Sequence, residues 1–166
     1  MNNNNLKIYL STDHAGFDLC HFVVESLKND GYDVEYLGPD VINTEDDYPL
    51  FIKKAADQVS ANTDSIGIVF GGSGTGEAIV ANKTKGIRCA LYYGRAHAVG
   101  VVDAEGNESH SPYEIVKLAR LHNDANMLSV GARFVSKDEA VEVIKLFLET
   151  EFENKERHVR RISEIE

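Results

Sequence analysis

The segment Ile66-Gly67-Ile68-Val69-Phe70-Gly71-Gly72-Ser73-Gly74-Thr75-Gly76-Glu77-Ala78-Ile79-Val80-Ala81 decides how the rest of the sequence is interpreted. An apolar run leads into a glycine-rich turn, and small and apolar residues follow that turn. This order predicts a buried strand, a tight turn and the start of a helix. Glycines let the backbone approach a ligand closely, and the first N–H groups of a helix have no partner within it. The turn is therefore a candidate site for a phosphate or for an oxyanion that develops during a reaction.

The glycine turn does not fit two familiar nucleotide-binding loops. Gly71 and Gly76 have the spacing of G-x-x-x-x-G-K-[ST], but Glu77 and Ala78 stand where that loop has a lysine and a hydroxyl residue. A carboxylate repels a terminal phosphate and alanine cannot ligate magnesium, so a nucleoside triphosphatase is disfavoured. The fingerprint G-x-G-x-x-G also fails, because Glu77 replaces its last glycine. Glu77 is then either a first-turn acid that complements the helix dipole or a catalytic group.

Length and composition predict one globular domain over residues 1–166. Of these residues 43% are hydrophobic and 27% are charged, which suits a chain with a single core. The formal net charge of −10 argues against general nucleic-acid binding. Because no apolar run is long enough to span a bilayer and no signal-peptide pattern is present, we expect a cytoplasmic protein without a membrane partner. Cys20 and Cys89 are predicted to be buried, reduced thiols, and residues 1–5 a mobile tail.

Strand and helix signals alternate along the chain. Strands are predicted at 6–11, 33–37, 65–70, 87–93 and 127–130, and helices at 17–29, 48–61, from the glycine turn to about 83, up to about 121, and at 137–149. In the first helix, Phe22, Val23 and Leu27 are predicted core positions. Ser136 is predicted to be the N-cap of the last helix of this series, which Glu139 three residues later supports. The alternation predicts an α/β fold: an α/β/α sandwich in which helices cover both faces of a five-stranded parallel sheet, as in Rossmann-like proteins.

Three segments of interest follow predicted strands. Asp13 and His14 follow the first strand, the glycine turn follows the third, and Gly131-Ala132-Arg133 follows the fifth. The carboxyl ends of parallel strands meet at one edge of a sheet, and ligands of such folds bind there. We therefore expect these segments to share one site.

Two further segments interrupt the alternation. Residues 94–112 (GRAHAVGVVDAEGNESHSP) are either a surface hairpin without chemistry, or a lid or subunit contact. Residues 151–166 form a C-terminal extension that is predicted to be helical, and a spacing of four residues places Arg157 and Arg161 on one helix face. This extension is either a solvated helix with salt bridges or an anion site that reaches a neighbouring subunit.

Five motifs occur in order along the chain: Ser11-Thr12-Asp13-His14-Ala15-Gly16, Asp47-Tyr48-Pro49, Gly71 to Glu77 with Ala81-Asn82-Lys83, His122-Asn123-Asp124-Ala125-Asn126, and Gly131-Ala132-Arg133. Together they resemble the ribose-5-phosphate isomerase type B family, with its galactose-6-phosphate and allose-6-phosphate isomerase relatives, over nearly the whole chain. The resemblance implies a flavodoxin-like fold, a homodimer (or a tetramer) with shared active sites, and isomerisation of an aldose to a ketose without metal. Interconversion of ribose 5-phosphate and ribulose 5-phosphate is the leading prediction. The alternatives are an isomerase of a six-carbon aldose 6-phosphate and a sugar-phosphate-binding paralogue without turnover.

The resemblance also implies catalytic roles. Many relatives have a catalytic cysteine near position 71, whereas this sequence resembles the branch in which a glutamate at the end of the turn, here Glu77, is the base. Isomerisation through an enediolate needs such a base and donors for the oxyanion, and the backbone N–H groups of Gly74, Thr75 and Gly76 are candidate donors. Ser73 is a candidate proton shuttle between O1 and O2. His122 matches the histidine that opens the furanose ring. Asp13 is a candidate for orienting sugar hydroxyls or the ring oxygen, for capping the following helix, or for both.

The remaining candidate residues bind substrate. The family's phosphate positions are matched by His14, Arg133, Arg157, His158 and Arg161, some of them supplied by a second subunit. Asn123 is assigned to sugar hydroxyls or the oxyanion, and Gly72 belongs to the turn. Tyr48 either lines the sugar pocket or packs beside Pro49. The six histidines show no spacing typical of a metal cluster, so no metal or cofactor is expected. Residues 94–112 are the departure from the family pattern.

Overall fold

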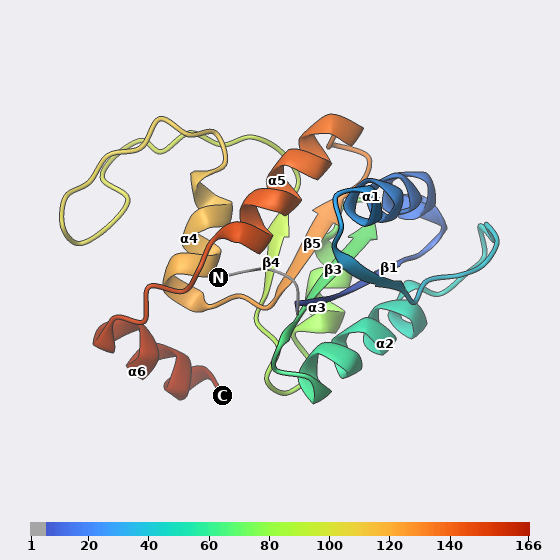
Figure 1. Cartoon of the computed structure of the whole chain (residues 1–166), viewed down its shortest axis with the longest axis horizontal. Coiled ribbons are helices and arrows are strands. Elements are labelled where there is room, and N and C mark those ends of the chain that lie inside the picture. Colours follow the sequence, from blue (N-terminus) through green and yellow to red (C-terminus); the bar gives the residue numbers. More distant parts are fainter. Residues whose placement is uncertain (1–5) are drawn as a thin grey trace.

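A parallel sheet forms the centre of the computed structural model, which describes residues 6–166 (Figure 1). Its strands are β1 (Lys7–Thr12), β2 (Asp33–Tyr36), β3 (Ser65–Gly71), β4 (Cys89–Tyr92) and β5 (Met127–Gly131). They lie in the order β2-β1-β3-β5-β4, and each pairing is parallel. The predicted five-stranded parallel sheet is confirmed. β4 begins two residues later than predicted, because the backbone N–H of Arg88 donates to the Asn126 side chain at 2.8 Å instead of to a strand.

Helices cover both faces of the sheet. The described residues contain a short 3₁₀ turn (His14–Gly16) and the helices α1 (Phe17–Asn29), α2 (Tyr48–Ala61), α3 (Thr75–Ala81), α4 (Glu114–Asn123), α5 (Lys137–Glu149) and α6 (Glu156–Ile165). Figure 1 shows α1 and α5 on one side of the sheet and α2 and α3 on the other. The predicted N-cap is confirmed, since Ser136 Oγ accepts a hydrogen bond from Glu139 N–H at 3.3 Å, while the Glu139 carboxylate accepts from the Tyr92 hydroxyl. The α/β/α sandwich predicted from the alternation of elements is therefore the observed architecture.

Successive side chains of a strand point to opposite faces of the sheet, so the core consists of one cluster on each face. Ile8 and Leu10 enter the cluster beneath α1, α4 and α5, while Tyr9 enters the cluster beneath α2. The prediction that Phe22 belongs to the core is wrong, because Phe22 is 36% exposed. The Lys137 ammonium lies over its ring, 5.0 Å from the ring centroid. Val23 and Leu27 are fully buried, and Phe22 lies one position away from that buried stripe, about 100° around the helix.

Two segments lie outside this sandwich. Residues 94–112 form an irregular hairpin, in which Val102 N–H donates to Asn107 C=O at 2.7 Å and Ala96 N–H donates to Pro112 C=O at 3.0 Å. Helix α6 lies beyond α4, away from the sheet (Figure 1). Within residues 6–166, no helix combines the length and the apolar character that crossing a membrane requires. The predicted tail at residues 1–5 lies outside the described residues. Cys20 is buried as predicted, Cys89 is only half-buried, and both are free thiols.

Candidate active site

The carboxyl ends of β1, β3 and β5 converge on a pocket of about 430 Å³. The chain runs from β1 to β2 on one side of β1 and then crosses to β3 on its other side, so the pocket lies where the strand order reverses. The segments after these three strands therefore meet, as the sequence predicts. The predicted site residues that line the pocket are Asp13, His14, Tyr48, Gly72, Ser73, Gly76, Glu77 and Arg133.

The glycine turn is held in place by the end of β5. Gly71 C=O accepts from Ala132 N–H at 2.8 Å, and Gly72 C=O accepts from Arg133 N–H at 3.1 Å. Ser129 Oγ donates to Gly74 C=O at 2.6 Å. Gly74 has φ +76°, which favours glycine, and a Cβ there would lie 3.0 Å from the Gly131 nitrogen. These bonds fix the turn at the start of α3. Gly72, Ser73 and Gly76 line the pocket, whereas Gly74 and Thr75, also predicted for the site, are not among the described residues that line it.

Glu77 lies in the first turn of α3 and is only 5% exposed. Its carboxylate folds back across Gly71: a Cβ on Gly71 would lie 2.0 Å from Glu77 Cδ and Oε1. Burial raises the pKa of Glu77, and the charge of Asp13 adds to this, while the backbone N–H of Glu77 acts in the opposite direction. The sequence left open whether the helix start or dehydration governs this group. In the structure dehydration dominates, so Glu77 is a stronger base than an exposed glutamate.

His14 is held by Asp46, a residue that the sequence analysis missed. The backbone N–H of His14 donates to Asp46 Oδ2 at 3.0 Å, and His14 Nδ1 lies 2.5 Å from Asp46 Oδ1. The hydrogen bond with Asp46 raises the pKa of His14, against the opposing effect of burial. The ring is therefore fixed and its protonated form is favoured. The available signal was the acidic run Glu45-Asp46-Asp47 ahead of α2, but only the folded loop shows which of these acids turns inward.

Other pocket residues have equally definite positions. Asp13 Oδ1 accepts from Ala15 N–H at 2.9 Å, so its predicted capping role is confirmed. The Arg133 guanidinium lies against Gly72, where a Cβ would be 3.2 Å from Arg133 Cζ. The Tyr48 ring lies against Gly76, where a Cβ would be 2.8 Å from the hydroxyl oxygen. Ser73 Oγ accepts from Thr75 N–H at 3.3 Å. Exposed Phe134 also lines the pocket and was not predicted.

Five predicted site residues lie elsewhere in the single chain. They are on α4 and α6, and no residue of these two helices is among the described residues that line the pocket: His122, Asn123, Arg157, His158 and Arg161. The His122 and His158 rings stack with centroids 4.4 Å apart. Their Nε2 atoms lie 3.4 and 2.8 Å from Glu153 Oε1. Burial, and then the charge of His122, lower the pKa of His158. Arg161 is exposed.

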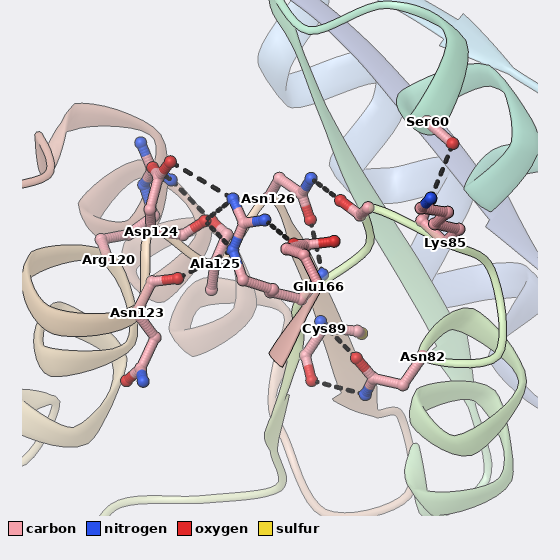
Figure 2. A network of polar contacts seen from close by, with 12 residues as sticks. Ser60, Asn82, Lys85, Cys89, Arg120, Asn123, Asp124, Ala125, Asn126 and Glu166 are labelled. Atoms are coloured by element: carbon pink, nitrogen blue, oxygen red, sulfur yellow. Dashed lines mark hydrogen bonds and ion pairs between the residues drawn. The ribbon is translucent and has the colours of Figure 1, made fainter. Parts of the chain in front are cut away.

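Asn123 borders a polar network that includes Asp124, Asn126 and Glu166 (Figure 2), and Arg88 donates to Asn123, Asp124 and Glu166 within it. The Asn123 carbonyl accepts from Arg88 Nε at 2.9 Å, whereas its side chain points away from the network. Asn123 is also among the residues that line a second pocket of about 410 Å³. Beside it, Asn82 Nδ2 donates to Cys89 C=O at 2.9 Å and Cys89 N–H donates to Asn82 Oδ1 at 2.8 Å. The side-chain amide of Asn82 thus makes the pair of hydrogen bonds to edge strand β4 that a neighbouring strand would make.

The family model described as Ribose/Galactose Isomerase matches residues 8–106 and 108–165. The chain belongs to this family. It is 36% identical to ribose-5-phosphate isomerase B of Mycolicibacterium paratuberculosis over 157 residues, which covers 95% of this chain and 87% of the relative. Among solved structures, ribose-5-phosphate isomerase B from Mycoplasma genitalium with bound ribulose-5-phosphate has a TM-score of 0.82 and 34% identity, covering 96% of this chain and 93% of that one. The Thermotoga maritima enzyme has a TM-score of 0.80 and 33% identity, covering 96% of each chain.

This member of the ribose/galactose isomerase family also brings together groups that its sequence spacing did not predict. His122, Glu153 and His158 form one set of candidate metal-ligand atoms, and Asp13, His14 and Asp46 form another, each within 4.8 Å. Each set already has a cation beside it. Arg157 Nε lies 3.0 Å from His158 Nε2, and the positive charge of Arg133 acts on His14. These guanidinium groups oppose a metal ion at either set, while the carboxylates of Asp13 and Asp46 oppose an anion at the second one.

Proposed function

We propose that this chain interconverts D-ribose 5-phosphate and D-ribulose 5-phosphate through an enediolate. The observation that carries the proposal is the buried Glu77 carboxylate in the pocket at the ends of β1, β3 and β5, with a raised pKa and the first N–H groups of α3 beside it. Family membership supports the reaction class, and the relative from Mycoplasma genitalium was solved with ribulose-5-phosphate bound.

In the proposed reaction, Glu77 removes the proton from C2 of the open-chain aldose. The C2–H electrons form the C1–C2 double bond, and the carbonyl electrons move to O1, which the N–H groups of Gly74 and Gly76 stabilise while the Thr75 N–H is bonded to Ser73 Oγ. Ser73 passes a proton from O2 to O1, and its Oγ is oriented by the Thr75 N–H. Glu77 then returns its proton to C1 while O2 becomes the carbonyl of the ketose. Every proton taken up is released, so no redox partner is required.

Substrate binding is divided between two chains in this proposal. His14 and Arg133 of one chain would bind anionic oxygens in the pocket, since both present positive charge there. His122, Asn123, Arg157, His158 and Arg161 would come from the partner in a symmetric homodimer. This arrangement is supported by the position of all five outside the pocket of their own chain. We place the enzyme in the cytoplasm, in keeping with its free thiols Cys20 and Cys89.

A mixing experiment tests the shared site. Glu77→Gln and His122→Ala homodimers should each be inactive, because each lacks one catalytic group at both sites. In a mixed dimer one site carries both changes and the other carries neither, so unfolding and refolding the two together should recover about a quarter of wild-type activity. If heterodimers of the two variants form and the mixture still stays inactive, both groups belong to one chain and the shared site is wrong.

The reaction itself is tested with purified protein, without added metal, on ribose 5-phosphate and allose 6-phosphate. Turnover of ribose 5-phosphate is the expected result. Turnover of the six-carbon sugar alone would show that the substrate is a six-carbon aldose 6-phosphate. Binding without turnover would identify a non-catalytic paralogue. Glu77→Gln should abolish exchange of the C2 proton while phosphate affinity is kept. Glu114→Gln is the matched control, because Glu114 is a 7% exposed carboxylate on α4 that is bonded to Ser109.

A further inference from the structure

The tip of the 94–112 hairpin has a fixed conformation. Asp103 Oδ1 accepts from Glu105 N–H at 3.0 Å and from Asn107 N–H at 2.9 Å, and Asn107 Nδ2 donates to Asp103 Oδ2 at 2.5 Å. Gly106 has φ +85°, which allows the chain to reverse here. These bonds make the tip a tight turn, and the turn presents the Glu105 side chain toward α6.

The Glu105 carboxylate binds the guanidinium fork of Arg157. Arg157 Nη1 donates to Oε1 at 2.8 Å and Nη2 donates to Oε2 at 3.1 Å. Lys155 Nζ lies 3.3 Å from Oε2 and also 3.0 Å from Glu153 Oε2. Two carboxylate oxygens on an arginine fork reproduce the way in which two phosphate oxygens bind the same group. The hairpin therefore places an anion on Arg157, next to His158.

We propose that Glu105 competes with the phosphate of the substrate for Arg157, so that the 94–112 hairpin sets substrate affinity. This inference rests on the proposed function, in which Arg157 is a phosphate ligand. A phosphate dianion and the Glu105 carboxylate would repel each other if both lay against the Arg157 guanidinium, so binding of one displaces the other. Glu153 remains with Lys155 and the two histidines when Glu105 leaves. The hairpin tip is then released from α6 each time substrate enters.

The matched pair of variants is Glu105→Gln and Glu108→Gln. Both remove one negative charge from the same hairpin, but Glu108 makes no ion pair within residues 6–166. Because an exposed ion pair contributes only modestly, Glu105→Gln should tighten binding of inorganic phosphate by about two- to fivefold. The KM for ribose 5-phosphate should fall by a similar factor, with kcat unchanged. Glu108→Gln should leave both quantities at wild-type values.

Phosphate affinity is measured by titration calorimetry, and KM and kcat by the isomerase assay. Unchanged or weaker phosphate binding in Glu105→Gln overturns the proposal, and so does an equal gain in Glu108→Gln, which would indicate a general charge effect. In an Arg157→Ala background the gain should vanish, and a gain that persists also overturns it. The calorimetric arm needs no turnover: a gain in phosphate affinity in a protein that does not isomerise ribose 5-phosphate supports competition while rejecting the isomerase assignment.

Discussion

Replacing Gly71 with alanine would place a methyl group where the Glu77 carboxylate lies. The added Cβ would be 2.0 Å from Glu77 Cδ and Oε1 and 2.5 Å from Oε2. Ordinary carbon contacts need about 3.5 Å, so the carboxylate must move by about 1.5 Å. Gly71 is not among the described glycines with positive φ, so its backbone tolerates alanine. The three nearest atoms all belong to the end of one side chain, so the base should move while the fold is kept.

A displacement of about 1 Å in a catalytic group costs about 10²-fold in rate, and complete loss of a general base costs about 10²- to 10⁴-fold. We therefore expect kcat of Gly71→Ala to fall at least about 10²-fold, with little change in thermal stability. The assays are kcat on ribose 5-phosphate and NMR of C2 proton exchange in D₂O. Gly100→Ala is the control, since a Cβ there would meet no described atom within 4 Å. A kcat for Gly71→Ala within about threefold of wild type would refute the assigned position of the base.

Two further predictions concern Asp46 and Asn82. Asp46→Asn should lower stability by about 1 to 2 kcal/mol, and Asp47→Asn, which changes the adjacent acid, is the control. The pKa of His14 is raised in the folded state, so this contribution is fully present below its ordinary value of 6.5 and is lost as pH rises through the folded pKa. Urea unfolding should show the largest loss of unfolding free energy in Asp46→Asn at the acid end of that window. A loss that grows with pH would contradict the pairing of His14 with Asp46. Asn82→Ala should cost about 1 to 2 kcal/mol, because two bonds to β4 are lost, whereas neighbouring Lys83→Ala should be neutral in the same assay.

Local pattern explains why the sequence predicts the elements so closely. Helices α1, α2 and α5 begin and end at the predicted residues, because apolar periodicity, Pro49 and the Ser136 cap act within a few residues. Phe22 shows the limit of this reasoning, because an apolar residue beside a buried stripe can still face solvent. The start of β4 was also misplaced, since the partner of Arg88 N–H is Asn126, far away in the sequence.

Within the candidate site, motif order predicts the pocket-lining residues from three strand ends. It does not predict Asp46, Glu105 or Glu153, whose partners are brought near only by loops and by α6. Acidic side chains are common on surfaces, so no sequence signal separates these three from solvated carboxylates.

The sequence by itself determined the parallel α/β architecture, the glycine turn and the presence of a glutamate where a nucleotide loop has lysine. These features depend on residue types at short spacing. The tertiary structure alone decided that burial raises the pKa of Glu77 and that its carboxylate occupies the space of a side chain at Gly71. It also separated the His122 group from the pocket and placed Glu105 on Arg157. Dehydration, charge pairing and the position of distant side chains depend on how the whole chain packs, and the linear sequence does not contain those distances.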